Sequence, residues 1–126
     1  MNRIETIARG VCIKKGKVLL CAPKGGAYNY LPGGHIEFGE TGREALEREM
    51  KEETGLKSKA GALVGVVESV FMQKGRKHAE INLIYRLALK NTKVASRESW
   101  IEFKWWPVED LRRANLLPAE MIKYVK

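Results

Sequence analysis

One segment, residues 41 to 54, limits the fold and the chemistry of this chain more than any other. It has the polar and apolar spacing of an amphipathic helix, and Gly55 follows it as a helix-ending residue. On such a helix Glu49, Glu52 and Glu53 stand at positions i, i+3 and i+4, which places three carboxylates on one face. Unpaired carboxylates this close repel one another, whereas a hard divalent cation such as Mg²⁺ prefers oxygen ligands. The segment therefore predicts a helix with a metal-binding face.

Charge is distributed unevenly along the chain. The sequence holds 23 basic and 15 acidic side chains, for a net charge of +8. Seven of the acids and only three bases lie between Glu37 and Glu53, so that segment carries −4 and the remainder +12. A polyanion would avoid the acidic cluster unless cations bridged the two. The distribution disfavours a nucleic-acid partner, with an RNA 5′ end as the one exception considered below.

Length and composition bound the class of protein. The chain has 126 residues, 44% of them hydrophobic, which fits a single folded domain over 1–126. No apolar run approaches the roughly 20 residues that cross a bilayer, and charges interrupt the first ten residues, unlike a signal peptide. We therefore expect no membrane partner and a cytoplasmic location.

Cys12 and Cys21 lack the spacing of a zinc site and do not face each other in the expected hairpin, so we expect no disulfide.

Short apolar segments on both sides of the helix predict a sheet. Residues 7–13 and 17–21 are typical of a hairpin with Lys15-Gly16 as its turn. The longest strand candidates, 62–71 and 79–89, are expected to pair antiparallel. The remaining elements are a short strand at 28–31, a flexible loop at Gly33-Gly34, a strand at 100–106, and short helices at 108–114 and 118–125.

Two side-chain patterns predict which faces are buried. In the 79–89 segment Glu80, Asn82 and Arg86 alternate with apolar residues, which indicates one polar face and one core face. On the helix, an apolar stripe is expected to pack against the sheet; it consists of Ala45, Leu46 and Met50. The strand that leads into the last helices is expected to place its tryptophans in the core; these are Trp100, Trp105 and Trp106.

A 23-residue motif runs from Gly34 to Leu56. Five residues separate Gly34 from Glu40, seven more follow, and the motif ends in the letters REMKEETGL. At every position it is similar to the Nudix box, GX5EX7REUXEEXGU, where U is aliphatic. The chain therefore resembles the Nudix (MutT-like) hydrolase superfamily, and the resemblance extends to Leu31-Pro32-Gly33 before the motif and to residues 106–111 after it. It implies an α/β chain with the Nudix fold, an α/β/α sandwich around a mixed β-sheet.

The resemblance also implies a chemistry. Family members hydrolyse a nucleoside diphosphate linked to another group, with Mg²⁺ as cofactor and Mn²⁺ as an alternative. Carried over position by position, the metal ligands would be Glu49, Glu52, Glu53 and the carbonyl of Gly34. A carboxylate must take the proton of the attacking water, and Glu49 or Glu52 is the expected catalytic base.

Other glutamates of the chain are assigned supporting roles. Arg48 and Glu40 would hold the loop of the motif onto the helix, so that the carboxylates are preorganised. Some family members use a more distant glutamate as ligand or base. Glu98, in the loop before Trp100, is the first candidate for that role, and Glu80 is the second.

The residues after the motif leave the substrate open. Residues 70–73 contain neither the proline expected of ADP-ribose hydrolases nor the tyrosine of diadenosine polyphosphate hydrolases. By elimination we expect a nucleoside triphosphate diphosphatase, which releases a monophosphate and pyrophosphate. The alternatives are a 5′ RNA pyrophosphohydrolase, a hydrolase of nucleotide sugars or ADP-ribose, and, in a different class, a noncatalytic nucleotide-binding module. The charge of +12 on the rest of the chain favours the RNA substrate, whereas the lack of a basic-aromatic array opposes it. The complete set of motif glutamates opposes the noncatalytic nucleotide-binding module.

A small-molecule nucleotide is the expected partner, and its base needs a flat aromatic or apolar wall with a few polar groups. The candidates for this pocket are Tyr28, Asn29, Tyr30, Phe71, His78 and Glu80. The single histidines, His35 and His78, lack ligand spacing. A homodimer is common in the family, but no interface can be read from these residues.

Overall fold

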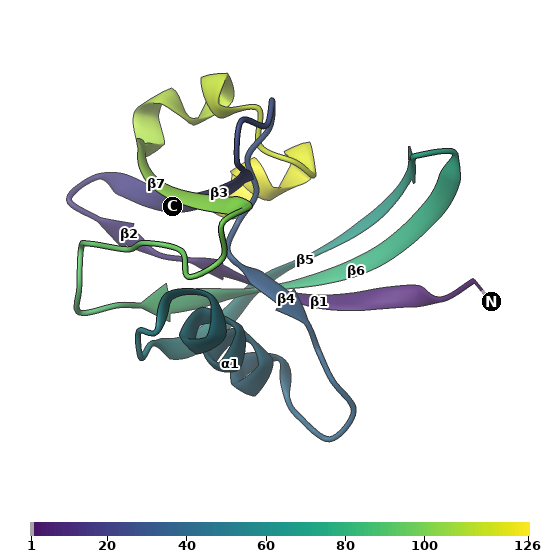
Figure 1. The fold of residues 1–126 in the computed structure, drawn as a ribbon, viewed down its shortest axis with the longest axis horizontal. Helices are drawn as coiled ribbons and strands as arrows, with labels where there is room; N and C mark the ends of the chain where they lie inside the picture. The colour runs from purple at the N-terminus through teal and green to yellow at the C-terminus, as the bar shows by residue number, and fades with distance from the viewer. Residues whose placement is uncertain (1) are drawn as a thin grey trace.

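The computed structural model describes residues 2–126 and builds them around two β-sheets (Figure 1). In the first sheet β1 (Ile4–Val11) lies between β4 (Gly33–His35) and β6 (Arg76–Ala88), and β5 (Lys59–Gln73) forms the outer edge beside β6. The β1–β6 pair is parallel and the other pairs are antiparallel, so the sheet is mixed, as expected. The second sheet has the order β2-β3-β7. Its strands are β2 (Ile13–Lys14), β3 (Lys17–Pro23) and β7 (Ile101–Pro107).

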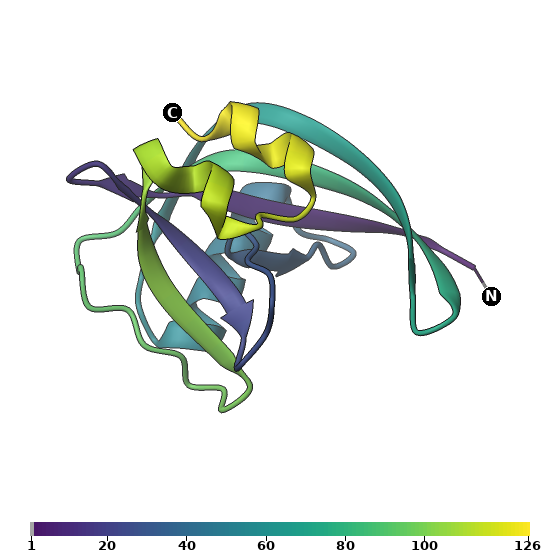
Figure 2. The ribbon, with the colours of Figure 1, turned by 90° about the horizontal axis from the view of Figure 1, so that it is seen from above.

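Helices cover the first sheet from opposite sides (Figures 1 and 2). The helix α1 (Gly42–Thr54) packs on one face through a core that it shares with β1 and β6. The 3₁₀-helices η1 (Val108–Ala114) and η2 (Ala119–Tyr124) close a second core together with the second sheet. The predicted α/β/α sandwich is therefore confirmed, although the layer opposite α1 is built from 3₁₀ turns and a second sheet.

The sequence signals at both ends of α1 are confirmed. Thr41 accepts a hydrogen bond from the backbone N–H of Glu44, and the Glu44 side chain accepts one from the backbone N–H of Thr41. This reciprocal capping box satisfies two backbone donors that a helix start leaves free. Gly55 adopts the left-handed conformation, with φ of 77°, and ends the helix. The predicted apolar stripe is fully buried; it consists of Ala45, Leu46 and Met50.

The predicted hairpin of 7–13 with 17–21 is only partly right. The Lys15-Gly16 turn is confirmed, because Lys14 pairs with Lys17 and the Leu19 N–H donates to the Cys12 carbonyl at 3.0 Å. Of the 7–13 segment, however, only the part in β2 pairs with β3, whereas β1 pairs with β4 and β6. Adjacent residues of β1 such as Ile7 and Ala8 are both buried, as in a strand covered on its two faces, and this burial favours an interior position. Both cysteines are buried and free.

The segment before the motif also differs from the prediction. Asn29 and Tyr30 make only isolated bridges, and the regular strand is β4, where a flexible loop was expected at Gly33-Gly34. A Cβ on Gly33 would overlap the carbonyl group of Ala8 on β1. Glycine at position 33 therefore allows β4 to approach β1 closely. This requirement becomes visible only when the two strands are seen paired.

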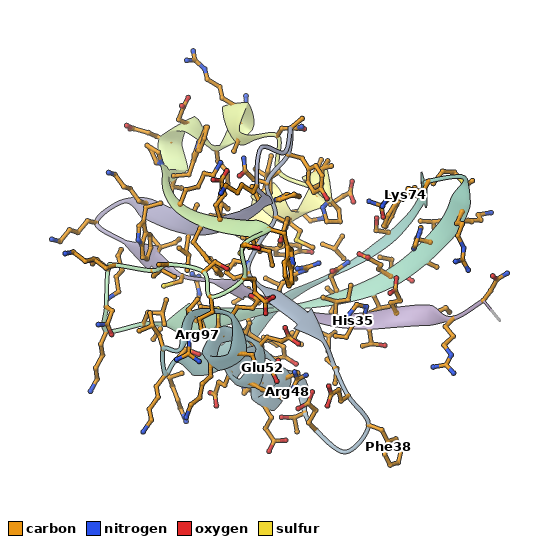
Figure 3. The ribbon with its side chains drawn as sticks, viewed as in Figure 1. His35, Phe38, Arg48, Glu52, Lys74 and Arg97 are labelled. Carbon is orange, nitrogen blue, oxygen red and sulfur yellow. The ribbon has the colours of Figure 1, made fainter. Side chains whose placement is uncertain are left out.

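The face pattern predicted for the 79–89 strand holds for only part of β6. Asn82 and Ile84 are fully buried on one face, and Tyr85 and Leu87 are buried on the other. Because β6 lies between β1 and β5, with a core on each side, the predicted polar face is covered at Asn82 and Ile84 and reaches solvent only at Arg86 and Ala88. The other end of β6 runs with β5 past the second sheet as a long curved hairpin, with Lys74 at its tip (Figures 1 and 3).

The tryptophan prediction is wrong for one residue. Trp100 precedes β7 and is 61% exposed, whereas Trp105 and Trp106 are partly buried. The indole N–H groups of the latter two donate to the Thr92 and Asp110 carbonyls at 2.6 and 2.8 Å.

Within residues 2–126, no helix has the length and apolar character needed to cross a membrane.

Candidate active site

Arg48 ties the loop of the 34–56 motif to α1. Its Nη2 and Nε atoms donate to the two carboxylate oxygens of Glu40 at 2.7 and 3.1 Å, a two-pronged pair. Nη2 also donates to the His35 carbonyl at 3.0 Å. The hydrogen bonds from Arg48 lower the pKa of Glu40, and those to Glu40 and Glu49 raise the pKa of Arg48. The arrangement expected for Glu40 and Arg48 is thus present as a contact.

The same guanidinium contacts the acidic cluster. Arg48 Nη1 lies 2.9 Å from Glu49 and 3.3 Å from Glu52, and Figure 3 shows Arg48 and Glu52 together on α1. Two of the three carboxylates expected to be unpaired are therefore partly neutralised by a residue of their own helix. Arg48 contacts both Glu40 and the acidic cluster, so the position of its guanidinium affects the loop of the motif and the cluster together.

We predict that Arg48→Lys lowers the free energy of unfolding by about 1 to 3 kcal/mol, because lysine keeps the charge but loses the planar fork that grips Glu40. Denaturant unfolding of both proteins measures the difference. Arg112→Lys is the control, since Arg112 is exposed on η1. Equal losses in the two variants would show that the fork at position 48 adds nothing.

Gly34 lies directly beneath Glu49. A Cβ at this position would come within 2.6 Å of Glu49 Oε2, so the missing side chain leaves the space that the carboxylate occupies. Gly34 pairs with Ala8 of β1, which fixes it in the first sheet. The β4 strand and α1 therefore bring the Gly34 backbone and the Glu49 side chain together, as the family motif implies for a metal site.

Glu53 is the most strongly perturbed acid. Burial raises its pKa to about 7, the negative charges of Glu49, Glu98 and Glu52 act in the same direction, and Arg9 opposes them. The loop that carries Glu98 is attached to the end of α1, because the Arg97 N–H donates to the Glu53 carbonyl at 2.6 Å. The fold thus brings Glu98, the predicted distal residue, into the electrostatic environment of the cluster.

We predict a pH-dependent contribution of Glu53 to stability in metal-free protein. The pKa of Glu53 in the folded state, about 7, lies above its ordinary value of 4.5, so between these pH values the folded state binds this proton more tightly than the unfolded state does. The stability that protonated Glu53 contributes is therefore lost as the pH rises from 4.5 through 7. Glu53→Gln removes the titration. Urea unfolding at pH 5 and pH 8 should show the variant gaining stability relative to the parent at pH 8; the same difference at both pH values would contradict the assignment.

The residues of the cluster suit a hard divalent cation. Carboxylate and carbonyl oxygens are the ligands that Mg²⁺ prefers, and Gly34 leaves its backbone open beside Glu49. Within residues 2–126, no three His, Cys, Asp or Glu side chains stand close enough to hold a metal ion in their present positions. Since Arg48 contacts Glu49 and Glu52, a bound cation would compete with its guanidinium for them.

A cavity of about 660 Å³ opens beside the cluster. We call the part lined by Glu49 and Glu53 the acidic end; the rest of the wall combines aromatic and apolar side chains with charged or polar ones such as Arg9 and Glu80. Tyr28 and Tyr30 come from the connection between β3 and β4, and Phe71 comes from the far end of β5. A cavity of this size and character fits a nucleotide-sized ligand.

The structure places the predicted pocket residues in two groups. Four of them line the cavity: Tyr28, Tyr30, Phe71 and Glu80. His78 stacks on Phe71, with ring centroids 5.2 Å apart and planes at 12°, and so supports the wall. Asn29 is buried and donates to the Ala114 carbonyl at 2.6 Å, which joins the β3–β4 connection to η1.

Sequence reasoning missed Arg9. This side chain lines the cavity from β1, beside the ring of Tyr30. The available signal was a lone arginine in an otherwise apolar strand segment, Ile7-Ala8-Arg9-Gly10-Val11. His35, which the sequence did not assign to the pocket, is exposed, lines the cavity and contacts Glu5 at 2.8 Å.

The fold and site define an α/β protein with a carboxylate-bearing helix beside a nucleotide-sized cavity. The family model of the NUDIX domain matches residues 3–125, so the chain belongs to the Nudix superfamily. It is similar in fold to a crystal structure of a MutT NUDIX hydrolase from Burkholderia pseudomallei, with a TM-score of 0.82 and 19% identity over 99% of this chain and 100% of that one. A MutT protein from Methanosarcina mazei Go1 gives a TM-score of 0.77 at 23% identity, over 98% of this chain and 91% of that one.

Curated relatives resemble part of the chain more closely. An ADP-ribose pyrophosphatase of Methanocaldococcus jannaschii is 46% identical over 63 residues, which is 48% of this chain and 37% of the relative. The human 8-oxo-dGDP phosphatase NUDT18 is 38% identical over 81 residues, which is 62% of this chain and 23% of the relative. The matched segments thus span well under half of these relatives' length.

Proposed function

We propose that this chain is a Mg²⁺-dependent hydrolase of nucleoside diphosphates linked to another group, and that a nucleoside triphosphate is its substrate, giving a monophosphate and pyrophosphate. One observation carries the proposal. Glu49 and Glu53, from the motif helix, line the same cavity as the aromatic residues Tyr28, Tyr30 and Phe71. A polyphosphate needs the acidic, cation-binding end, and a nucleoside needs the aromatic end.

The reaction requires a water molecule to attack phosphorus while the anhydride P–O bond breaks. Mg²⁺ held by Glu49, Glu52, Glu53 and the Gly34 carbonyl would neutralise phosphate oxygens and lower the pKa of the attacking water. Glu49 or Glu52 then accepts the proton of that water. The leaving phosphate group takes the electrons of the broken P–O bond, and the attacked phosphorus keeps the new oxygen.

The positions of three groups of the chain support this chemistry. Arg48 holds the Glu40 loop and the His35 carbonyl against α1, so the catalytic helix faces Gly34 in one orientation. Glu98 lies near the cluster, on a loop that is hydrogen-bonded to Glu53, and we assign it as the distal ligand or base. The half-buried position of Glu49, with 19% of its side chain exposed, limits competing water around the base.

ADP-ribose is the second candidate substrate. It is favoured by the Methanocaldococcus jannaschii relative, named as an ADP-ribose pyrophosphatase, which is 46% identical over 63 residues. ADP-ribose also contains a diphosphate between two groups, so the same acidic end would serve it. It is opposed by the absence of proline from residues 70–73, where such hydrolases carry one.

A product-resolved hydrolysis screen with Mg²⁺ tests both candidates. The panel contains ordinary and oxidised nucleoside triphosphates, ADP-ribose, nucleotide sugars, dinucleoside polyphosphates and a 5′-triphosphate RNA. Pyrophosphate released from a triphosphate supports the proposal, and cleavage confined to ADP-ribose supports the second candidate. If nucleotides bind but none is cleaved, the chain is a binding module and the hydrolase proposal fails.

A further inference from the structure

Arg9 is a cation on the cavity wall without an acidic partner. Among residues 2–126, no ion pair includes Arg9, although the chain forms such pairs around Arg48, Arg113 and both histidines. Burial lowers the pKa of Arg9, with the charge of Glu80 opposing that shift. A desolvated guanidinium on a cavity wall is costly unless a ligand uses its hydrogen bonds. The position therefore suggests a role in binding.

The Arg9 side chain is held rigidly. Its Nε donates to Asn82 Oδ1 at 3.4 Å, and Nη1 donates to the Leu31 carbonyl at 3.1 Å. Asn82 is fully buried and itself donates to the Val67 carbonyl and to Glu80, at 3.3 and 3.4 Å. A guanidinium has five N–H groups in a fixed plane, so three remain free for a ligand.

The surroundings of Arg9 suit a base better than a phosphate. Its Cζ atom lies 5.5 Å from the ring centroid of Tyr30, whose ring is 6.2 Å from that of Tyr28. Bases stack on such rings whatever their identity, so discrimination among them requires a polar group in the same plane. At the acidic end of the cavity, Glu49 already has Arg48 beside it, whereas the charge of Arg9 acts there on Glu53.

We propose that Arg9 is a specificity-determining residue that reads the base of the substrate, its free N–H groups binding two adjacent acceptors on the base edge. Guanine is the base that fits, because its O6 and N7 atoms lie side by side, whereas adenine carries a donor at the corresponding position. This inference rests on the proposed function, which supplies the nucleotide. It adds the residue that selects the base.

Removing one acceptor from the base tests the contact without changing the protein. The parent enzyme should hydrolyse GTP with a kcat/KM about 10- to 100-fold above that for 7-deaza-GTP, which lacks N7, and above that for ATP. In Arg9→Lys and Arg9→Met these ratios should approach one. Equal loss on all three substrates would overturn the proposal, since it would indicate a phosphate or scaffold role. A parent enzyme that does not separate GTP from the other two would also overturn it.

A binding measurement on metal-free protein keeps this test independent of hydrolysis. NMR titration with guanosine and adenosine, which carry no phosphate, should show tighter guanosine binding that Arg9→Lys abolishes. Arg112→Lys, on the exposed surface of η1, is the matched control and should keep the preference. Thermal melting confirms that each variant is folded. Equal binding of the two nucleosides by the parent overturns the role of Arg9, whereas guanosine preference without any hydrolysis overturns only the proposed function.

Discussion

Glu52→Gln is expected to lower kcat for hydrolysis by at least about 100-fold, the effect of losing a general base or a metal ligand. The substitution keeps the shape of the side chain and removes its charge. Glu52 is 58% exposed, and within residues 2–126 its side chain is hydrogen-bonded to Arg48 alone, at 3.3 and 3.5 Å. Exposed pairs of this kind contribute little to folding, so we expect the free energy of unfolding to change by less than about 0.5 kcal/mol.

A matched variant separates this effect from a general change in charge. Glu109→Gln alters an exposed glutamate of η1, away from the cavity-lining residues, and should retain parental kcat. Steady-state kinetics at saturating Mg²⁺ and denaturant unfolding of all three proteins provide both readouts. A fully active Glu52→Gln enzyme would remove Glu52 from the catalytic assignment and leave Glu49 as the candidate base.

Leu46→Ala is expected to lower the free energy of unfolding by roughly 2 to 5 kcal/mol, the range for a leucine truncated in a packed core. Leu46 has no exposed surface and belongs to the core between α1 and the first sheet. Its loss would leave a cavity beneath the helix that carries the glutamates, and activity should fall with stability near the unfolding midpoint. Urea unfolding with a constant m-value measures the change.

Leu63→Ala is the control for the core prediction. Leu63 lies on β5 and is 47% exposed, so the same chemical truncation removes little buried surface. We expect a change below about 1 kcal/mol at this position. If the two leucine variants lost equal stability, the packing of α1 on the sheet would not be the source of the Leu46 effect.

Local features of the sequence determined the motif helix. The start at Thr41, the end at Gly55 and the buried stripe of Leu46 and Met50 follow from side-chain chemistry within a few residues, because helical hydrogen bonds and caps connect near neighbours. The same periodicity placed Glu49, Glu52 and Glu53 on nearby turns. The family resemblance, carried by the 34–56 motif, then supplied the sandwich fold that the structure shares with other Nudix proteins.

Tertiary structure decided what the remaining residues do. Alternation along β6 could not show that Asn82 is buried and braces Arg9, because the pairing of β1 with β6 joins residues more than 70 positions apart. The tertiary structure also leaves Trp100 exposed and places Glu98 near Glu53. The cavity takes its walls from several strands and connections, so its composition depends on how strands pair and cores close. Strand pairing and core closure depend on contacts between residues far apart in the sequence, and a local sequence pattern does not specify those contacts.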